Sequence, residues 1–294
     1  MATTKTSKPQ TLSEKTADIK YQSNPFALSF DKFGQFFEKN LGWAIALIIL
    51  PIFGFFFQLL ISIIDAATMP NANAHGGHAH PEIQLGSIDP AAIGLISLTV
   101  ILVAVLLATV IVVSVAMQTF ISGLFSYVAL ENEAGRTARF STAVDAVVAR
   151  FWRLFLAQLL ATAKIFGWTL LLIIPGIVAV FRYALLPYVI MDEPASKKGV
   201  KDSHDRVKAL VAGRKREIFG VATVATIIPI VGNLIQFIGN AALYRQLQIF
   251  HDKKLEKPAI HWLNYFGFVL IGLYALLIVF IAAIAILATL SSRY

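Results

Sequence analysis

The segment from Leu170 to Phe219 constrains the fold of this chain more than any other. It holds two apolar runs separated at Pro175, then an acidic pair at residues 192–193, then a strongly basic segment with helical spacing that ends at Gly213. Adjacent apolar runs of this length are typical of membrane-spanning helices. Because proline interrupts a helix, the break predicts a helical hairpin whose two ends lie on the same side of a membrane.

The composition places the whole chain in the same class. Hydrophobic residues make up 57% of the 294 residues and charged residues 14%, whereas soluble domains average about 25% charged. The chain has no cysteine, which excludes disulfides and thiolate chemistry. The first apolar run begins at Leu41, too late for a cleavable secretory signal peptide. We therefore predict an all-α, polytopic helical membrane protein.

The apolar runs predict six long arms and one short arm within a single membrane domain over residues 25–294. Residues 218–230 form the short arm, which is about 20 Å of helix and a candidate re-entrant segment. Residues 1–24 are rich in Thr, Ser and Lys and predict a disordered cytoplasmic tail. The long arms are predicted at residues 41–65, 91–118, 152–174 and 177–191, from Gly232 to Phe250, and at residues 263–290.

Charge decides the predicted topology. Residues 192–217 hold eight basic residues, whereas residues 66–90 hold none. Because cytoplasmic loops carry an excess of Lys and Arg, we expect residues 66–90 to be external and both 192–217 and the N-terminus to be cytoplasmic. A single span over residues 165–181 is an alternative, but it would place the basic segment outside. The net charge of +8 then indicates contact with anionic headgroups rather than with nucleic acid.

Two segments have the pattern of amphipathic helices. Phenylalanines recur at helical spacing between residues 26 and 37, which predicts either a helix docked on the inner membrane surface or the first turns of the following span. Within the basic segment, Val200, Val207 and Leu210 share one face of a predicted helix over residues 196–212, with Gly213 as its C-terminal stop. That face is expected to contact lipid or the protein body.

The order of elements between residues 130 and 250 resembles a known family. ARFWRLFLAQLL precedes LLLIIPGIVAVFRYALLPYVIMDEP, and a basic helix containing Ser203 and ending at Gly213 leads into IFG. This order is similar to the membrane domain associated with bacterial glycerophosphoryl diester phosphodiesterases, and to related uncharacterised multi-helix inner-membrane proteins. The resemblance implies a bacterial inner (cytoplasmic) membrane location. It does not imply the enzyme activity, because the roughly 250 residues of a soluble barrel have no counterpart here.

Two cations interrupt the predicted hairpin. Lys164 precedes Pro175 by 11 residues and Arg182 follows it by 7, so a hairpin would bring them to similar depths. Ionisable residues within spans are functional candidates, and an anionic lipid phosphate would compensate two cations that have no acidic partner in either span. The alternative is that both side chains extend to the interface and have a structural role only.

Two further clusters are weighed for chemistry. His75, His78 and His80 could hold zinc or copper, but they lie in a glycine-containing loop without an evident fourth ligand, and a solvated external loop is the alternative. The residues at 202–205 include the types of a catalytic triad. Since adjacent residues on a helix point about 100° apart, they cannot form a relay.

The sequence thus predicts a non-enzymatic integral membrane protein that acts through membrane lipids, anionic ones among them, or through a protein partner or a second copy of itself. It indicates no catalytic residue, no cofactor and no metal site beyond the weak histidine cluster. A transporter of small solutes or lipids is the first alternative, and a membrane-embedded hydrolase or transferase is the second. The anion-binding candidates are Lys164 and Arg182.

Overall fold

The structure is a computed structural model that describes residues 21–68, 90–196, 199–228 and 231–291. These residues form helices and no strand, which confirms the predicted all-α class. In chain order the helices are α1 (Pro25–Phe30), α2 (Phe33–Thr68), α3 (Pro90–Glu133), α4 (Phe140–Val148), α5 (Phe151–Leu171), α6 (Ile173–Tyr183), α7 (Leu186–Asp192), α8 (Val200–Val211), α9 (Lys215–Ile227), α10 (Gly232–Asp252), the 3-10 helix η2 (Trp262–Tyr265) and α11 (Phe266–Ser291).

Four stretches of helix among the described residues are long and apolar enough to cross a membrane, which indicates a multi-pass membrane protein. The six long arms of the sequence prediction are not confirmed. One reason lies in α10, which covers the arm predicted up to Phe250: its apolar residues, such as Leu234 and Leu243, are buried against other helices. The four stretches are Val112–Glu133, Phe151–Leu171, Ile173–Asp192 and Trp262–Thr289.

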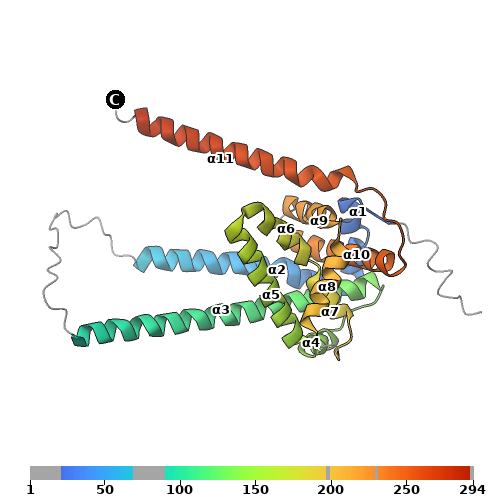
Figure 1. Ribbon diagram of the computed structural model, residues 1–294, viewed down its shortest axis with the longest axis horizontal. Coiled ribbons are helices and arrows are strands. Elements are labelled where there is room, and N and C mark those ends of the chain that lie inside the picture. The colour runs from blue at the N-terminus through green and yellow to red at the C-terminus, as the bar shows by residue number, and fades with distance from the viewer. Residues whose placement is uncertain (1–20, 69–89, 197–198, 229–230, 292–294) are drawn as a thin grey trace, which may run out of the picture.

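The molecule has two parts, a helical body and three bare arms that extend from it toward one side (Figure 1). The bare arms are residues 49–68 of α2, residues 90–117 of α3, and α11. The apolar side chains of α3 that the structure describes between Leu98 and Met117 are mostly exposed, whereas the helix is largely buried from Thr119 onward. At about 1.5 Å per residue, the 44 residues of α3 span roughly 66 Å, about twice the ~30 Å hydrocarbon core. Helix α3 therefore belongs to both the body and the bare arms.

The helical body is assembled around α10, which contacts α1, α2, α3, α7, α8 and α9. The acidic pair after α7 ties it to its neighbours. Asp192 forms an ion pair with Arg245 at 2.7 Å and accepts a hydrogen bond from the Tyr244 hydroxyl at 2.9 Å. Glu193 forms a buried ion pair with Arg153 of α5 at 3.2 Å. The Asp-Glu pair that ends the apolar hairpin in the sequence thus fixes α7 to α5 and α10.

Helices α5 and α6 pack as a hairpin, and the chain turns at Leu172, three residues before the predicted break. The two helices approach closely at Gly176, where an added Cβ atom would clash with Thr169 Oγ1. Side chains from Leu170 to Ile174 at the tip are exposed and apolar. A second break follows at Leu185, between α6 and α7.

Helix α8 is the predicted amphipathic helix, although it begins at Val200 rather than at residue 196, and its apolar face is directed to the body. Val207, Leu210 and Ser203 are fully buried, and α8 contacts α5, α6, α7 and α10. Lys201 and Lys208 lie on the exposed side. The helix ends where expected, because Gly213 adopts a φ of 74°, which favours glycine.

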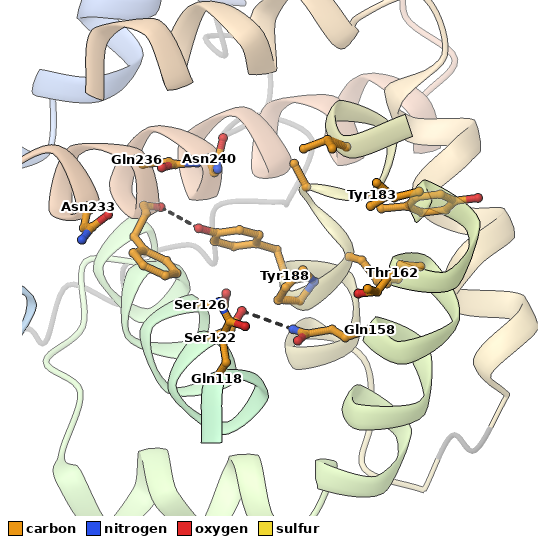
Figure 2. Close-up of a pocket in the computed structure, with 17 residues that line it drawn as sticks. Gln118, Ser122, Ser126, Gln158, Thr162, Tyr183, Tyr188, Asn233, Gln236 and Asn240 are labelled. Atoms are coloured by element: carbon orange, nitrogen blue, oxygen red, sulfur yellow. Dashed lines mark hydrogen bonds between the residues drawn. The ribbon is translucent and has the colours of Figure 1, made fainter. Parts of the chain in front are cut away.

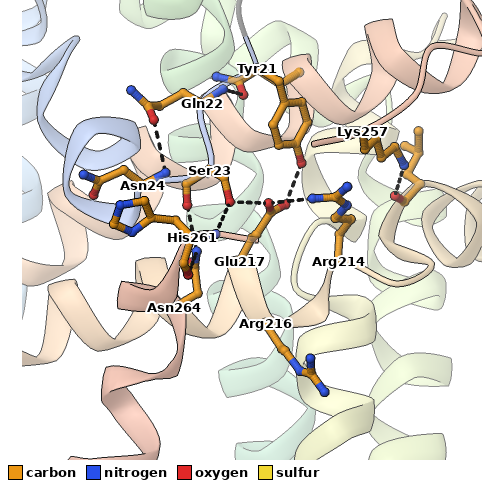
Figure 3. A network of polar contacts seen from close by, with 12 residues as sticks. Tyr21, Gln22, Ser23, Asn24, Arg214, Arg216, Glu217, Lys257, His261 and Asn264 are labelled. Carbon is orange, nitrogen blue, oxygen red and sulfur yellow. Dashed lines mark hydrogen bonds and ion pairs between the residues drawn. The ribbon is translucent and has the colours of Figure 1, made fainter. Parts of the chain in front are cut away.

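The N-terminal segment differs from its prediction. A disordered tail was expected through residue 24, but residues 21–24 lie against the body (Figure 3). The Tyr21 ring packs edge-on against Phe250 at 4.8 Å, and its hydroxyl donates to the buried Glu217 carboxylate at 2.5 Å. Ser23 Oγ donates to the same carboxylate at 2.8 Å, and Arg214 forms an ion pair with it at 3.1 Å. These partners compensate the burial of Glu217, which explains why a polar segment is ordered here.

Candidate ligand-binding pocket

A polar hollow lies in the helical body between α3, α5, α10 and the α6–α7 break (Figure 2). Its polar side chains arise from helical spacing, because residues four apart share a face. Gln118, Ser122 and Ser126 follow that spacing on α3, and Gln158 and Thr162 follow it on α5. On α10 the corresponding residues are Asn233, Gln236 and Asn240.

The hollow comprises two adjoining cavities. The larger has a volume of about 500 Å³, and its lining residues in the described part of the chain are all uncharged. The smaller has a volume of about 350 Å³ and shares Gln118, Ser122, Gln158, Asn233 and Phe237 with the larger. It adds an apolar wall from α2 and α3, formed by Leu47, Ile121 and Phe125.

Part of the polar lining is internally paired. Gln158 accepts a hydrogen bond from Thr119 Oγ1 at 3.0 Å and donates one to Ser122 Oγ at 3.3 Å, which joins α5 to α3. The buried Tyr188 hydroxyl donates to the carbonyl of Phe237 at 3.1 Å and so joins α7 to α10. These bonds hold the wall in place without using all of its hydrogen-bonding capacity.

The remaining hydrogen-bonding groups of the lining face the hollow. The side chains of Gln118, Asn233 and Gln236 make no hydrogen bond to another residue in the described ranges, and all three are exposed where they line the cavities. The buried side-chain oxygens of Ser126 and Asn240 also lack a partner of good geometry there. A primary amide both donates and accepts, so this lining suits an uncharged ligand that bears hydroxyl, ester or amide groups.

The hollow lies where the bare arms enter the body. Gln118 directly follows Met117, the last exposed apolar residue of the α3 arm. Leu47, in the smaller cavity, is the last buried residue of α2 before the exposed Ile49. If the bare arms lie in the bilayer, polar groups at this junction lie at the edge of the hydrocarbon layer.

The two predicted anion-binding cations do not line this hollow. Lys164 lies over the Tyr183 ring, 5.8 Å from its centroid, and its charged neighbours are Asp205 and Lys208 of α8. Arg182 has Lys215 of α9 as a charged neighbour. Because Arg182 and Tyr183 are adjacent on α6, the two cations are directed toward different partner helices. Their binding of an anion stays a prediction.

The other predicted clusters have different outcomes. His75, His78 and His80 lie outside the described residues, and the described residues contain no group of three or more His, Asp or Glu placed to hold a metal. In α8, Ser203 Oγ donates to Glu193 at 3.3 Å, whereas the His204 ring nitrogen Nε2 bonds to the carbonyl of Ala157 at 3.0 Å. Ser203 and His204 thus help to dock the helix on its neighbours.

The polar hollow was not predicted from the sequence, although a signal for it was present. Amides and hydroxyls recur four residues apart within apolar runs on α3 and α5, and three or four apart on α10. That periodicity places them on one face of each helix. What the sequence did not show was that the three faces converge.

The geometry therefore describes an uncharged, partly unsatisfied binding pocket at the junction of body and arms. No family model, curated protein or solved structure matches the chain. The similarity to the phosphodiesterase-associated membrane domain stays a prediction.

Proposed function

We propose that this chain is a non-enzymatic integral membrane protein that binds the uncharged polar portion of a lipid in the hollow between α3, α5 and α10. The observation that carries this proposal is a set of three amides, Gln118, Asn233 and Gln236, that make no hydrogen bond to another described residue and lie where the bare arms meet the body. Polar groups near the hydrocarbon layer are costly unless something satisfies them. A ligand that offers hydroxyl or ester groups would do so.

The shape of the hollow supports a lipid rather than a small solute. The amides line one part, while Leu47, Ile121 and Phe125 form an apolar continuation between α2 and α3. A molecule with a hydrogen-bonding head and an acyl chain matches both parts. Among the described residues the lining holds no Asp, Glu, His or Lys, which favours binding over acid–base hydrolysis.

The bare arms and the charge distribution support an orientation. We propose that the bare arms cross the bacterial inner membrane and that the basic face of the body, with the N-terminus, lies on its cytoplasmic side. Basic residues cluster in α8, α9 and the segments beside them, where they would meet anionic headgroups. Cysteines introduced at Ser196 and at Asn73, which lies outside the described residues, should be labelled from opposite sides. Labelling of both from one side would contradict this orientation.

The binding proposal is tested by replacing two of the unpaired amides. We expect Gln118→Leu with Gln236→Leu to abolish retention of a co-purifying uncharged or ester-bearing lipid, measured by native mass spectrometry of the detergent-solubilised protein. Gln58→Leu is the matched control, because Gln58 is exposed on the α2 arm, far along the helix from the hollow. An unchanged lipid profile in a double variant that melts at the temperature of the parent would exclude the pocket as the binding site.

A lipid or small-solute transporter is the second candidate, and one observation favours it. Ala184, Leu186 and Pro187 at the break between α6 and α7 line the larger cavity, and transporters bind substrates at discontinuous helices. Reconstituted vesicles distinguish the two functions. Transfer of a labelled lipid between leaflets, lost in the same double variant, would favour transport; binding without transfer would favour the first proposal.

A further inference from the structure

A pair of cations lies where the C-terminal end of α6 meets the first turn of α9. The Phe181 ring contacts the Phe219 ring edge-on at 5.2 Å, which fixes the C-terminal end of α6 against the first turns of α9. Arg182 follows Phe181, and Lys215 precedes Phe219 by one helical turn. The packing of the two rings thus brings Arg182 and Lys215 to the same end of the α6–α9 contact.

Neither cation has an acidic partner in the described part of the chain. Both are half-buried, and no carboxylate of the described residues forms an ion pair with either. Burial lowers the pKa of Lys215, and the charge of Arg182 lowers it further. Two like charges held together in a partly apolar setting favour an anion beside them.

The position of this pair relative to the last helix indicates its level in the membrane. Arg216, next to Lys215, donates to the Tyr265 hydroxyl at 2.7 Å, and its guanidinium lies over the Tyr265 ring at 5.0 Å. Tyr265 ends η2, and α11 begins at the next residue. Aromatic residues such as Trp262 and Tyr265 at the start of a spanning helix are typical of the membrane interface. The cations therefore lie at headgroup level if α11 crosses the bilayer.

The surroundings of the cations are apolar and open. Val178, one turn before Arg182 on α6, is exposed, and so is Phe268 in the first turn of α11, whose ring lies 4.6 Å from the Phe219 ring. A water-soluble anion gains nothing from these surfaces, whereas acyl chains pack against them. The ligand that matches both the charge and the setting is an anionic phospholipid.

We propose that Arg182 and Lys215 hold the phosphate of an anionic phospholipid in the angle between α6 and α9, with Arg216 beside them. Arginine donates two parallel hydrogen bonds to phosphate oxygens, and lysine adds a compact charge. This site shares no residue with the polar hollow and does not depend on it. Arg182 also belongs to the Lys164–Arg182 pair predicted from the sequence, whose binding of an anion stays a prediction, whereas Arg182 and Lys215 belong to one helix contact.

The test uses vesicles with equal amounts of phosphatidylglycerol and phosphatidylcholine. Full-length protein is reconstituted in them, extracted in mild detergent, and its bound lipids are counted by native mass spectrometry. Arg182→Gln with Lys215→Gln should lower the ratio of bound phosphatidylglycerol to phosphatidylcholine by about tenfold. The matched control is Lys201→Gln with Lys253→Gln, which removes the same charge from two exposed positions and should leave the ratio unchanged.

Three outcomes would overturn the proposal. If the glutamine variant and the parent bind the two lipids in the same ratio, the site does not exist. If the ratio falls equally in the control variant, the preference for phosphatidylglycerol depends on net charge and not on this site. If inorganic phosphate raises the melting temperature of delipidated protein as much as phosphatidylglycerol does, the ligand is a free anion and not a lipid. Arg182→Lys with Lys215→Arg preserves both charges and should retain the lipid, which keeps the test decisive if the glutamine variant unfolds.

Discussion

Helix α3 passes through both parts of the molecule, and its two halves show what distinguishes them. The apolar side chains that the structure describes between Leu98 and Met117 are mostly exposed, whereas from Thr119 to Asn132 the helix is largely buried. Both halves are rich in apolar residues. In the body those residues pack against other helices, but in the arm they have no partner among the described residues and suit contact with lipid. Hydrophobicity alone therefore does not separate a spanning segment from a core segment.

Polar residues do separate them. The body contains buried Glu217 and Glu193, each with a cationic partner, and the amides of the hollow. Helix α11 carries no Asp, Glu, Lys or Arg and no buried side chain in its span. The stability of the body thus depends on specific ion pairs and close packing, whereas the stability of the arms depends on the medium that surrounds them. A given type of substitution should therefore be severe in one part and mild in the other.

The largest effect is expected from a charge placed in the buried face of α8. Val207→Asp puts a carboxylate at a fully buried position without a partner, which should cost several kcal/mol and prevent folding of the body. Lys208→Asp makes a similar change one residue away on the exposed side and should be tolerated. The yield of monodisperse protein after detergent extraction measures both. Equal yields would show that α8 is not docked on the body.

A matched pair of truncations gives the next effect. Leu234→Ala in α10 removes a fully buried side chain and should destabilise the protein by about 2–5 kcal/mol. Leu276→Ala in α11 removes a side chain that is 67% exposed and should change stability by less than about 0.5 kcal/mol. Thermal unfolding in detergent compares them. Comparable losses would mean that α11 packs against something in the purified protein, such as a second copy of the chain.

The smallest effect is a pH dependence that should originate in the body. His204 is buried between Tyr183 and the Ala157 carbonyl, and burial lowers its pKa below the ordinary 6.5. Lys164 and Lys208 lower it further, while Asp205 and the carbonyl oppose the shift. The unfolded chain binds a proton near pH 6.5 that the folded chain does not. Stability should therefore be complete above that pH and fall as the pH decreases below it.

The measurement is the melting temperature between pH 7.5 and 5.5. His204→Gln retains an amide donor for the Ala157 carbonyl but cannot titrate, so its melting temperature should depend less on pH in this window. If the parent and the variant lose stability in parallel, the pH dependence belongs to other groups.

The sequence predicted the helical class, the α5–α6 hairpin and the amphipathic α8 because these follow from local patterns. Proline and glycine mark breaks, and the spacing of Val207 and Leu210 marks a face. The partners of such a face are not local. Whether α8 lies on lipid or on protein depended on α5 and α7, and the polar hollow depended on three helices whose polar faces meet. The ordered position of Tyr21 depends on its hydrogen bond to the carboxylate of Glu217, which is 196 residues away in the sequence.

The hydrogen bonds of Ser23 set an order of events during synthesis. Its hydroxyl accepts from the backbone N–H of His261, and its carbonyl accepts from Asn264, 241 residues further along the chain. The ribosome makes Ser23 well before it makes Asn264. Ser23 must therefore wait until residues 261–264 have emerged before these bonds can close. Only then is the segment around Ser23 joined to η2, which leads into α11, so the emergence of η2 completes this contact of the assembled body.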